Sequence, residues 1–446
     1  MGRPGRGTVP SDAEDLAWRH LPSWPFARTR MLTQHRLMNE SPRDHDIVVF
    51  GVTGFVGALV AEHLARHAPG TVRVALAGRS RAKVERAREG LPGRAQDWPV
   101  IVADVTDPAS LAAMAASSRV VLSTVGPYLR YGLPVVEACA RAGTHYADLT
   151  GETPFVREAI DRFDDVARDS GARIIHTCGY DSVPSDLVVL ALHRRVHADG
   201  AGELGRVLAV ASAKGGVSGG TVSSMRGIVE LSASDRSVRR LLADPFALSP
   251  DRASEPTVSQ PPDAPRPGRT VDGRWFAPSP MASVNTRVVR RSNALQGWAY
   301  GRSLRYGEVV GTGRGPSGAA AAVGVTAGLG LAAAAFAAPP TRALLDRLLP
   351  ASGTGPDEET RRTGFFRMDV RAVTSTGTHY RAVAAGPGDP GYAATAVMMG
   401  EAALALVLEQ EHLPDRAGSL TPATGIGDVL LDRLRVAGHT YDAAPR

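Results

Sequence analysis

The sequence predicts an α/β protein with a doubly wound parallel sheet first and a second α+β domain with a mostly antiparallel sheet after it. From residue 45 to about 197, short apolar runs alternate with helical stretches. Continuous apolar runs in that alternation are typical of parallel strands covered on both faces. Beyond about residue 197 the strands alternate apolar and polar residues, which is typical of an antiparallel sheet. The length of 446 residues also favours two or three domains.

Six apolar runs account for the parallel sheet. Strands are expected at 47–51, 72–78, 98–104, 119–126, 144–149 and 172–179. Helices are expected between them at 55–67, 80–89, from Asp107 onward, at 132–142 and at 154–170. Asp107 followed by Pro108 is typical of a helix start, because the aspartate can cap the first turn and proline suits its first position.

The second half is expected to contain strands and helices in a less regular order. Strands are predicted at 204–216, 285–295, 304–310 and within 365–386, and helices at 221–234 and 392–411. Many prolines and little periodicity predict a long loop at 243–283, and a loop followed by a last helix is predicted within 421–438.

These elements divide the chain into four parts. We expect a disordered or non-native extension at 1–44, a nucleotide-binding domain at 45–197, a substrate or oligomerisation domain at 198–390, and C-terminal helices at 391–446 that return to the first domain. The domain 198–390 includes the loop 243–283 and an uncharged segment at 315–341.

Composition narrows the class of function. The chain is 43% hydrophobic and 22% charged, as in soluble globular proteins, and its net charge of +6 is scattered. A scattered excess without aromatic residues between the basic ones argues against nucleic-acid binding. Cys139 and Cys178 form no metal-binding pattern, so a reducing cytoplasm is the expected location. His63 and His67 lack the intervening glutamate of a zinc-protease helix and are expected on a solvated face, so no metal is predicted.

The segment 319–338 is made almost wholly of alanine, glycine and aliphatic residues. It is long enough to cross a bilayer, although alanine and glycine contribute little to insertion. Two alternatives stay open, a helix packed on protein and a segment in peripheral contact with the plasma membrane.

A glycine motif follows the first strand. Gly51, Gly54 and Gly57 are spaced three residues apart, directly before the helix 55–67. In a Rossmann-type domain such glycines permit the tight turn, the approach of a pyrophosphate and close helix packing, and the helix N-terminus favours the negative charge. The motif in this context predicts a dinucleotide site.

The end of the second strand indicates which dinucleotide is bound. An NAD site usually has an acidic residue there to bind the ribose 2′-hydroxyl, whereas this chain has Arg79, Ser80 and, further on, Lys83. Guanidinium and hydroxyl groups suit a 2′-phosphate, so NADP(H) is the predicted cofactor. The residues assigned to it are Gly51, Thr53, Gly54, Phe55, Val56, Gly57, Arg79, Ser80, Lys83, Asp104, Thr124, Gly126 and Pro127.

The catalytic groups are less clearly marked. With Lys83 and Lys214 as its only lysines, and neither preceded by tyrosine four residues earlier, the chain lacks the Tyr-x-x-x-Lys pair of short-chain dehydrogenases. Ligands bind at the carboxyl edge of such a sheet, where polar groups are expected from Tyr128, His145, Tyr146, Asp148, Glu152, Tyr180 and Asp181. Of these, Tyr128, Tyr146, Tyr180 and Asp148 are the predicted catalytic residues, because a tyrosine can donate a proton beside the hydride acceptor.

A second motif suggests different chemistry. Residues 216–220 match Gly-x-Ser-x-Gly, with Ser218 between a strand and a helix as in a hydrolase nucleophile elbow. The nucleotide-binding pattern before it and the surrounding glycines favour a flexible turn instead.

Several blocks together resemble the saccharopine dehydrogenase-like oxidoreductases, and more closely their actinobacterial trans-acting enoyl reductase branch. They are HDIVVFGVTGFVG (45–57), LAGRSRAKVE (76–85), STVGPYLRYGLPVVEAC (123–139), THYADLTGE (144–152), HTCGYDSVPSD (176–186) and GSLTPATGIGD (418–428). The resemblance implies a Rossmann domain, a second α/β domain and a C-terminal helix that returns to the first. It also implies reduction of an enoyl thioester made by a polyketide synthase, in complex-lipid or glycolipid biosynthesis.

The expected function is therefore that of an NADPH-dependent oxidoreductase acting on an enoyl thioester, with a polyketide synthase as partner and a homodimer as the oligomeric state. Two alternatives remain, a dehydrogenase of an amino-acid or imine substrate and a non-catalytic, membrane-associated dinucleotide-binding protein.

Overall fold

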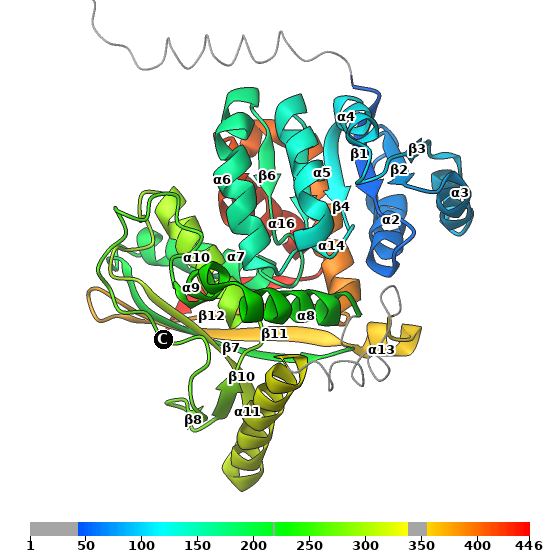
Figure 1. The fold of residues 1–446 in the computed structure, drawn as a ribbon. Coiled ribbons are helices and arrows are strands. Elements are labelled where there is room, and N and C mark those ends of the chain that lie inside the picture. The colour runs from blue at the N-terminus through cyan, green and yellow to red at the C-terminus, as the bar shows by residue number, and fades with distance from the viewer. Residues whose placement is uncertain (1–42, 217–218, 338–354) are drawn as a thin grey trace, which may run out of the picture. The chain divides into compact units, whose positions relative to one another are not determined.

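Two seven-stranded sheets form the frame of the protein in the computed structural model, which describes residues 43–216, 219–337 and 355–446 (Figure 1). The chain from Asp44 to Arg446 forms one compact unit. The predicted extension 1–44 lies almost wholly outside the described residues. So do residues 217–218 of the motif 216–220, which include Ser218, and residues 338–341 of the segment 315–341. The division into domains at 197 and 390 stays a prediction.

The first sheet is parallel throughout, with the strand order β13-β6-β5-β4-β1-β2-β3. Its strands are β1 (His45–Phe50), β2 (Val74–Gly78), β3 (Val100–Val102), β4 (Ser118–Ser123), β5 (His145–Asp148), β6 (Arg173–Ile175) and β13 (Gly418–Leu420). The doubly wound sheet is therefore confirmed. The C-terminal part of the chain adds its seventh strand beside β6.

Helices cover both faces of this sheet, which explains the continuous apolar strands. The helices of its chain segment are α2 (Phe55–His67), α3 (Arg81–Glu89), α4 (Pro108–Ala116), α5 (Tyr128–Ala142), α6 (Thr153–Ser170) and α7 (Val183–Ala198). Alternate residues of β1 point to opposite sides: Val48 packs with α4, α5 and α6, and Val49 packs with α2. Asp107 caps α4 by accepting a hydrogen bond from Ala109 N, as predicted.

The second sheet has the order β14-β12-β11-β7-β10-β9-β8 and is antiparallel except for the pair β7 and β10. Its strands are β7 (Leu204–Lys214), β8 (Gly268–Arg269), β9 (Trp275–Pro278), β10 (Arg305–Gly313), β11 (Phe365–Thr374), β12 (His379–Pro387) and β14 (Thr440–Pro445). The mostly antiparallel sheet is confirmed. β8 and β9 interrupt the predicted loop 243–283, and β14, which was not predicted, joins the sheet from the C-terminus.

The prediction of a strand at 285–295 is wrong. These residues form the helix α10 (Ala282–Leu295), which follows α8 (Gly219–Ser234) and α9 (Arg236–Ala243) in the sequence. Arg287, Arg290 and Arg291 can be buried because carbonyl oxygens at the end of α9 and in the loop after it accept their hydrogen bonds. Because arginines occupy buried positions of α10, its buried face does not appear as apolar residues at helical spacing. The sequence pattern of valine and arginine therefore resembles that of a strand.

The helices after β12 return to the first sheet, as predicted. They include the π-helical turn Pro390–Ala394, α14 (Thr395–Leu408), the short turn Gln410–His412, α15 (Pro422–Gly425) and α16 (Asp428–Val436). α14 packs on α2, where a Cβ atom on Gly400 would lie 2.3 Å from the His63 ring. His63 is 8% exposed and its Nε2 lies 2.8 Å from Glu401 Oε1, so its expected position on a solvated face is wrong.

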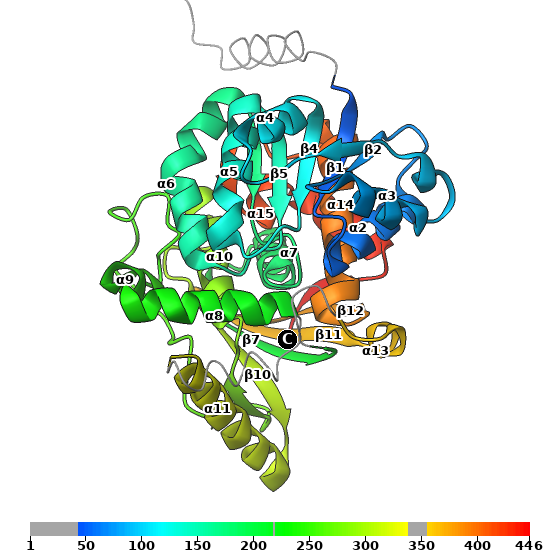
Figure 2. The same ribbon diagram turned by 45° about the vertical axis from the view of Figure 1, so that its right-hand side comes forward.

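A long apolar helix, α11 (Gly315–Ala337), projects from the second sheet on the side away from the first, as both views show (Figures 1 and 2). α13 (Glu358–Thr363) precedes β11. Among the described residues two helices are long and apolar enough to cross a membrane, Gly315–Phe336 and Pro390–Leu408. The second is 78% buried and belongs to the core, whereas the first is only 11% buried.

Candidate cofactor and active site

The turn after β1 has the close packing that its glycines predict. Gly51 has φ +96°, and its N–H donates to Ala77 O of β2 at 3.0 Å. A Cβ atom on Gly57 would lie 2.3 Å from Gly51 O, so only glycine lets α2 begin this close to the strand. A Cβ atom on Gly54 would meet only Gly51 O, at 3.3 Å.

Thr124, just after β4, fixes this turn from the other side. Its Oγ1 donates to Phe50 O at 3.2 Å and to Gly51 O at 3.1 Å. The same oxygen would lie 2.7 Å from a Cβ atom on either Gly51 or Gly57. The predicted cofactor residue Thr124 therefore lies against the glycine turn.

The first turn of α2 is suited to an anion. Its N-cap is Gly54, which offers no side-chain cap, and the first turn carries no acidic residue. Thr53 is exposed, and Phe55 and Val56 are half-buried. The free N–H groups of a helix N-terminus and its dipole favour phosphate, so the residues present fit a dinucleotide pyrophosphate.

Polar residues follow β2 and β3, the two strands that come after β1 in the order of the sheet. Arg79 follows β2 directly and is exposed, as is Lys83, and the Ser80 side chain makes no cap hydrogen bond to α3. Asp104 lies beyond β3, where hydrogen bonds from the backbone and hydroxyl of Thr106, and the charge of Arg79, lower the pKa of its carboxyl group. Arg79, Ser80 and Lys83 thus leave donors free for a 2′-phosphate, with no acidic residue at the end of β2.

Gly126 and Pro127 join β4 to α5 through a cis peptide bond, and Tyr128 begins the helix. The Tyr128 hydroxyl donates to Ser123 O at 2.9 Å, and burial strongly raises its pKa. Glu152 accepts hydrogen bonds from Tyr128 N at 3.1 Å and Leu129 N at 2.6 Å. Ser224 of α8 donates to the same carboxylate at 2.5 Å, which ties α8 to the carboxyl edge of the first sheet.

Asp148, at the end of β5, holds the neighbouring loop. Its Oδ2 lies 2.7 Å from His176 Nδ1, and its Oδ1 accepts from Thr150 N and Thr177 N, both at 3.0 Å. Tyr146 is fully buried, and its hydroxyl and His176 Nε2 have no hydrogen-bond partner among the described residues. The catalytic roles predicted for Tyr128, Tyr146 and Asp148 stay predictions, and the contacts of Tyr128 and Asp148 are those of residues that position the loops.

Not every candidate side chain lies at the carboxyl edge. His145 begins β5 and therefore lies at the amino edge, where its Nδ1 accepts from Arg173 N at 3.1 Å. The expectation that it lines the ligand edge is wrong. His145 is the first residue of β5 and Asp148 the last, so only Asp148 lies at the carboxyl edge.

Tyr180 and Asp181 follow β6 and reach toward the second sheet. The Tyr180 ring lies 5.5 Å from that of Phe366 on β11, and its hydroxyl makes no hydrogen bond within the described residues. Asp181 is half-buried, and a Cβ atom on Gly151 would lie 3.7 Å from its Oδ1 and 3.6 Å from Met281 Cε.

Burial raises the pKa of Asp181 to about 7, and the charge of Asp148 raises it further. In the described part of the chain, no other residue donates a hydrogen bond to this carboxyl group. A half-buried carboxyl group that titrates near neutral pH suits proton transfer. Sequence reasoning placed Asp181 among the candidates, but the surroundings that raise its pKa come from distant parts of the chain.

Comparison with known proteins agrees with this geometry. A family model described as the saccharopine dehydrogenase NADP-binding domain matches residues 47–175, which run from β1 to β6. A Mycobacterium tuberculosis protein provisionally named a trans-acting enoyl reductase is 50% identical over 413 residues, covering 90% of this chain and 98% of its own. A Mycobacterium bovis trans-acting enoyl reductase is 47% identical over the same shares. This chain belongs to the trans-acting enoyl reductase family.

The family assignment confirms the predicted resemblance and the NADP(H) cofactor. As a member of the trans-acting enoyl reductase family, the protein is an NADP-dependent oxidoreductase. The solved structure of Saccharomyces cerevisiae saccharopine dehydrogenase (L-Glu forming) covers 90% of this chain and all of its own, with a TM-score of 0.52 at 14% identity. That likeness supports the fold alone.

Proposed function

We propose that the protein reduces the α,β-double bond of an enoyl thioester with NADPH. The observation that carries the proposal is the identity of 47–50% with trans-acting enoyl reductases over 98% of their length. The turn at Gly51, with Arg79 beside it, supports the choice of cofactor.

Different residues of the chain would bind different parts of NADPH. Gly54 and the first turn of α2 would hold the pyrophosphate of NADPH, and Arg79 and Ser80 its 2′-phosphate. NADPH, when bound, supplies the hydride. An enoyl thioester reduced at its β-carbon develops negative charge on the thioester oxygen and needs a proton at its α-carbon.

Tyr180 and Asp181 are suited to these two needs. Burial raises the pKa of Tyr180, so its hydroxyl stays protonated and can donate a hydrogen bond to the thioester oxygen. Asp181, with a pKa of about 7, is partly protonated at neutral pH and can deliver the α-proton. Both roles are proposals, and the earlier predictions for Tyr128, Tyr146 and Asp148 compete with them.

An acceptor screen at fixed NADPH tests the function. We expect NADPH oxidation with crotonyl-pantetheine and longer enoyl thioesters, and none with imino acids. Oxidation with an imino acid alone would make the protein an amino-acid or imine dehydrogenase. NADPH binding without oxidation by any acceptor would leave the non-catalytic alternative.

The biological setting is proposed from the names of the relatives. A reductase that acts in trans would serve a polyketide synthase that lacks its own enoyl reductase, and the product would enter lipid or glycolipid biosynthesis. Incubation of the synthase with and without this protein, followed by mass analysis of the product, tests the partnership. A product with no change in saturation contradicts it. The homodimer stays a prediction.

We also propose that α11 contacts lipid, so that the protein lies in the cytoplasm against the plasma membrane. Val323 is 60% exposed and Leu331 71% exposed on a helix without charged residues. A helix that is apolar on all sides is ordinarily buried in protein or in a membrane. Fractionation of the protein with and without residues 315–341 tests the contact, and unchanged solubility contradicts it.

A further inference from the structure

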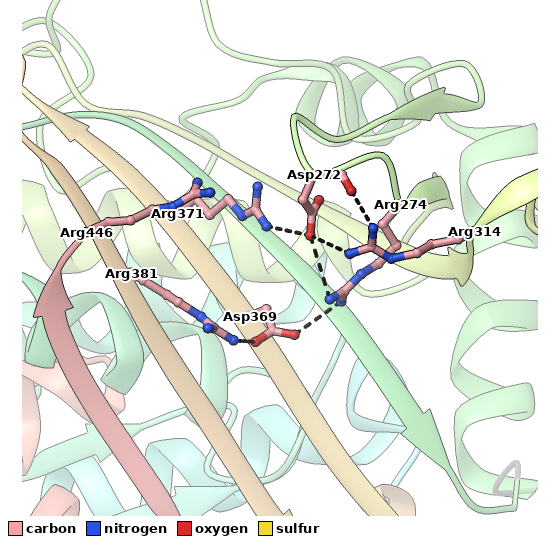
Figure 3. Close-up of a pocket in the computed structure, with 7 residues that line it drawn as sticks. All are labelled: Asp272, Arg274, Arg314, Asp369, Arg371, Arg381 and Arg446. Atoms are coloured by element: carbon pink, nitrogen blue, oxygen red, sulfur yellow. Dashed lines mark hydrogen bonds and ion pairs between the residues drawn. The ribbon is translucent and has the colours of Figure 1, made fainter.

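The second sheet has one face covered by the core of the protein and a second face that carries charged side chains. Along β11, Phe366, Met368 and Val370 are buried in the core that includes α7. Because side chains alternate along a strand, Asp369 and Arg371 lie on the opposite face. That face contains a pocket of about 280 Å³, lined by two aspartates and by the arginines 274, 314, 371, 381 and 446 (Figure 3).

The pocket contains more cationic than anionic side chains. Asp272 lies 2.6 Å from Arg371 Nη2, and Asp369 lies 3.0 Å from Arg381 Nη2 and 3.2 Å from Arg274 Nη1. The five arginines outnumber the two aspartates, so the pocket keeps a positive excess.

One donor in the pocket is also unused. Nη1 of Arg371 is buried and has no hydrogen-bond partner among the described residues. A buried guanidinium N–H without an acceptor is costly, and a phosphate oxygen is the acceptor that arginine binds best. The charge excess and the unused donor both indicate an anionic ligand.

The pocket lies at the base of α11. Arg314 directly precedes the helix, and its Nη1 donates to Asp272 O at 2.8 Å. Thr312 Oγ1 donates to Gly318 O at 2.9 Å, and Trp275 lies against Gly318, so the first turns of α11 are anchored on the sheet. The rest of the helix projects from the same side of the sheet (Figures 1 and 2).

We propose that this pocket binds the phosphate of an anionic phospholipid while α11 contacts the acyl chains, so that the two form one membrane-docking face. The inference rests on the lipid contact proposed above. At about 1.5 Å per residue, the 23 residues of α11 extend about 35 Å, and the hydrocarbon core of a bilayer is about 30 Å thick. The arginine cluster would lie at the level of the lipid headgroups, and the apolar helix beside it would lie among the acyl chains.

An acidic carrier protein fits this face less well. A carrier domain must deliver its substrate to the site near Tyr180, which contacts Phe366 on the covered face of the sheet. The arginine pocket lies on the other face, and docking of a polar protein would leave α11 without a role.

Vesicle sedimentation tests the proposal with the full chain. We expect binding to phosphatidylcholine vesicles that contain phosphatidylglycerol, and much weaker binding to phosphatidylcholine alone. Replacing Arg371 and Arg381 by glutamine should weaken binding to the anionic vesicles about 30-fold, from about 1 kcal/mol for each basic residue at a charged membrane. Binding to neutral vesicles should not change.

Matched variants separate the pocket from general charge. Arg194→Gln with Arg195→Gln removes two exposed, ion-paired arginines of α7, and this pair should bind anionic vesicles more tightly than the pocket variant by a clear margin. Leu331→Glu, on the exposed side of α11, should weaken binding to both kinds of vesicle. NADPH titration and NADPH oxidation in solution should be the same in all variants, so failure of the docking face is distinguishable from failure of the enzymatic proposal.

Three results would overturn the proposal. The first is equal binding of the pocket variant and the wild-type protein to anionic vesicles. The second is a thermal shift by inorganic phosphate that depends on Arg371 and Arg381, without vesicle binding, which would indicate a soluble phosphate ligand. The third is a change in sedimentation mass in the pocket variant without vesicle binding, which would make the face an interface between copies of this chain.

Discussion

Arg79 is the residue on which the choice between NADPH and NADH depends. It is exposed directly after β2, where its charge also acts on Asp104. Arg79→Ala removes a charge-assisted contact worth about 2 kcal/mol, so the Kd for NADPH should rise about 30-fold while that for NADH hardly changes. Fluorescence titration with both nucleotides measures this.

The neighbouring Arg81 provides the control for this measurement. It is exposed on α3 and pairs with Glu85 at 3.8 Å. Arg81→Ala should leave the Kd for NADPH within about twofold, as expected for an exposed ion pair. Equal losses in both variants would show a general effect of charge and would remove the assignment of Arg79 to the 2′-phosphate.

Asp181 should give the reaction its pH dependence. With a pKa of about 7 it is protonated below neutral pH, so the proposed proton donor predicts a kcat that falls as pH rises above about 7. Asp181→Asn should lower kcat by about 10²-fold or more and abolish that fall. The exposed Asp432, replaced in the same way, provides the control.

The same residue predicts a stability effect of defined sign. A carboxyl group whose pKa is higher in the folded than in the unfolded chain stabilises the fold at low pH, and that contribution is lost as pH rises through about 7. Asp181→Asn should therefore be more stable than the wild-type protein at pH 8, in a urea titration. For the rate, a wild-type kcat that is independent of pH between 6 and 9 would exclude Asp181 as the proton donor.

At the level of elements, two glycines of the turn between β1 and α2 have different roles: Gly57 allows close packing of the helix, and Gly54 is assigned to cofactor binding. A Cβ atom on Gly57 would lie 2.3 Å from Gly51 O, whereas one on Gly54 would lie 3.3 Å from it. Gly57→Ala should cost about 1–3 kcal/mol of unfolding free energy, because the helix must move. Gly54→Ala should keep its Tm and instead weaken NADPH binding about tenfold or more, because the pyrophosphate approaches that backbone.

Thermal unfolding and NADPH titration of both variants check this prediction. The two variants should differ in the quantity that changes: Gly57→Ala should have a lower Tm, and Gly54→Ala a higher Kd for NADPH. If both variants lose only stability, the turn has a packing role and the cofactor cradle lies elsewhere.

The accuracy of the sequence predictions differs between elements for physical reasons. The parallel strands up to β6 could be predicted because most of them are continuous apolar runs buried on both sides, and the helices because they alternate with these runs. α10 could not, because its arginines are buried through carbonyl groups 40 or more residues away, such as Leu242 O and Leu248 O. β14 is a short edge strand whose burial is concentrated in Tyr441, so its pattern is too brief to recognise.

The candidate site shows the same limit. The glycines could be predicted because they follow one strand with a known spacing, and Arg79 and Thr124 because each directly follows another strand of the same parallel sheet. The surroundings of Tyr180 and Asp181 could not, since Phe366, which packs on Tyr180, and Met281, which lies with Asp181 beside Gly151, come from other parts of the chain. Local motifs therefore predicted the cofactor, and tertiary contacts were needed to choose among the acidic and phenolic groups.

At the scale of the whole molecule, the C-terminal segment joins the two sheets. β13 extends the first sheet, β14 extends the second, and α14 packs on α2 between them. Glu401 of α14 holds this arrangement, with Oε1 2.8 Å from His63 Nε2 and Oε2 2.8 Å from Arg433 of α16. One carboxylate thus connects helices from both ends of the chain.

Glu401 should therefore control the stability of the whole molecule in a pH-dependent way. Burial raises its pKa, but the hydrogen bond to His63 and the charge of Arg433 outweigh burial and lower it overall. The stabilisation is then present above the unfolded pKa of about 4.3 and is lost as pH falls through the lower folded value. Glu401→Gln should cost about 1–3 kcal/mol at pH 7, and the difference from the wild-type protein should shrink below pH 4.

Urea unfolding at pH 7 and at pH 3 measures this difference. Glu409 is the matched control, because it lies 2.8 Å from the same Arg433 but is 35% exposed. Glu409→Gln should cost less than about 1 kcal/mol, since solvent screens an exposed pair. A larger loss for Glu409→Gln than for Glu401→Gln, or an unchanged Glu401→Gln difference in acid, would mean that apolar packing of α14 on α2 joins the two ends of the chain without help from this carboxylate.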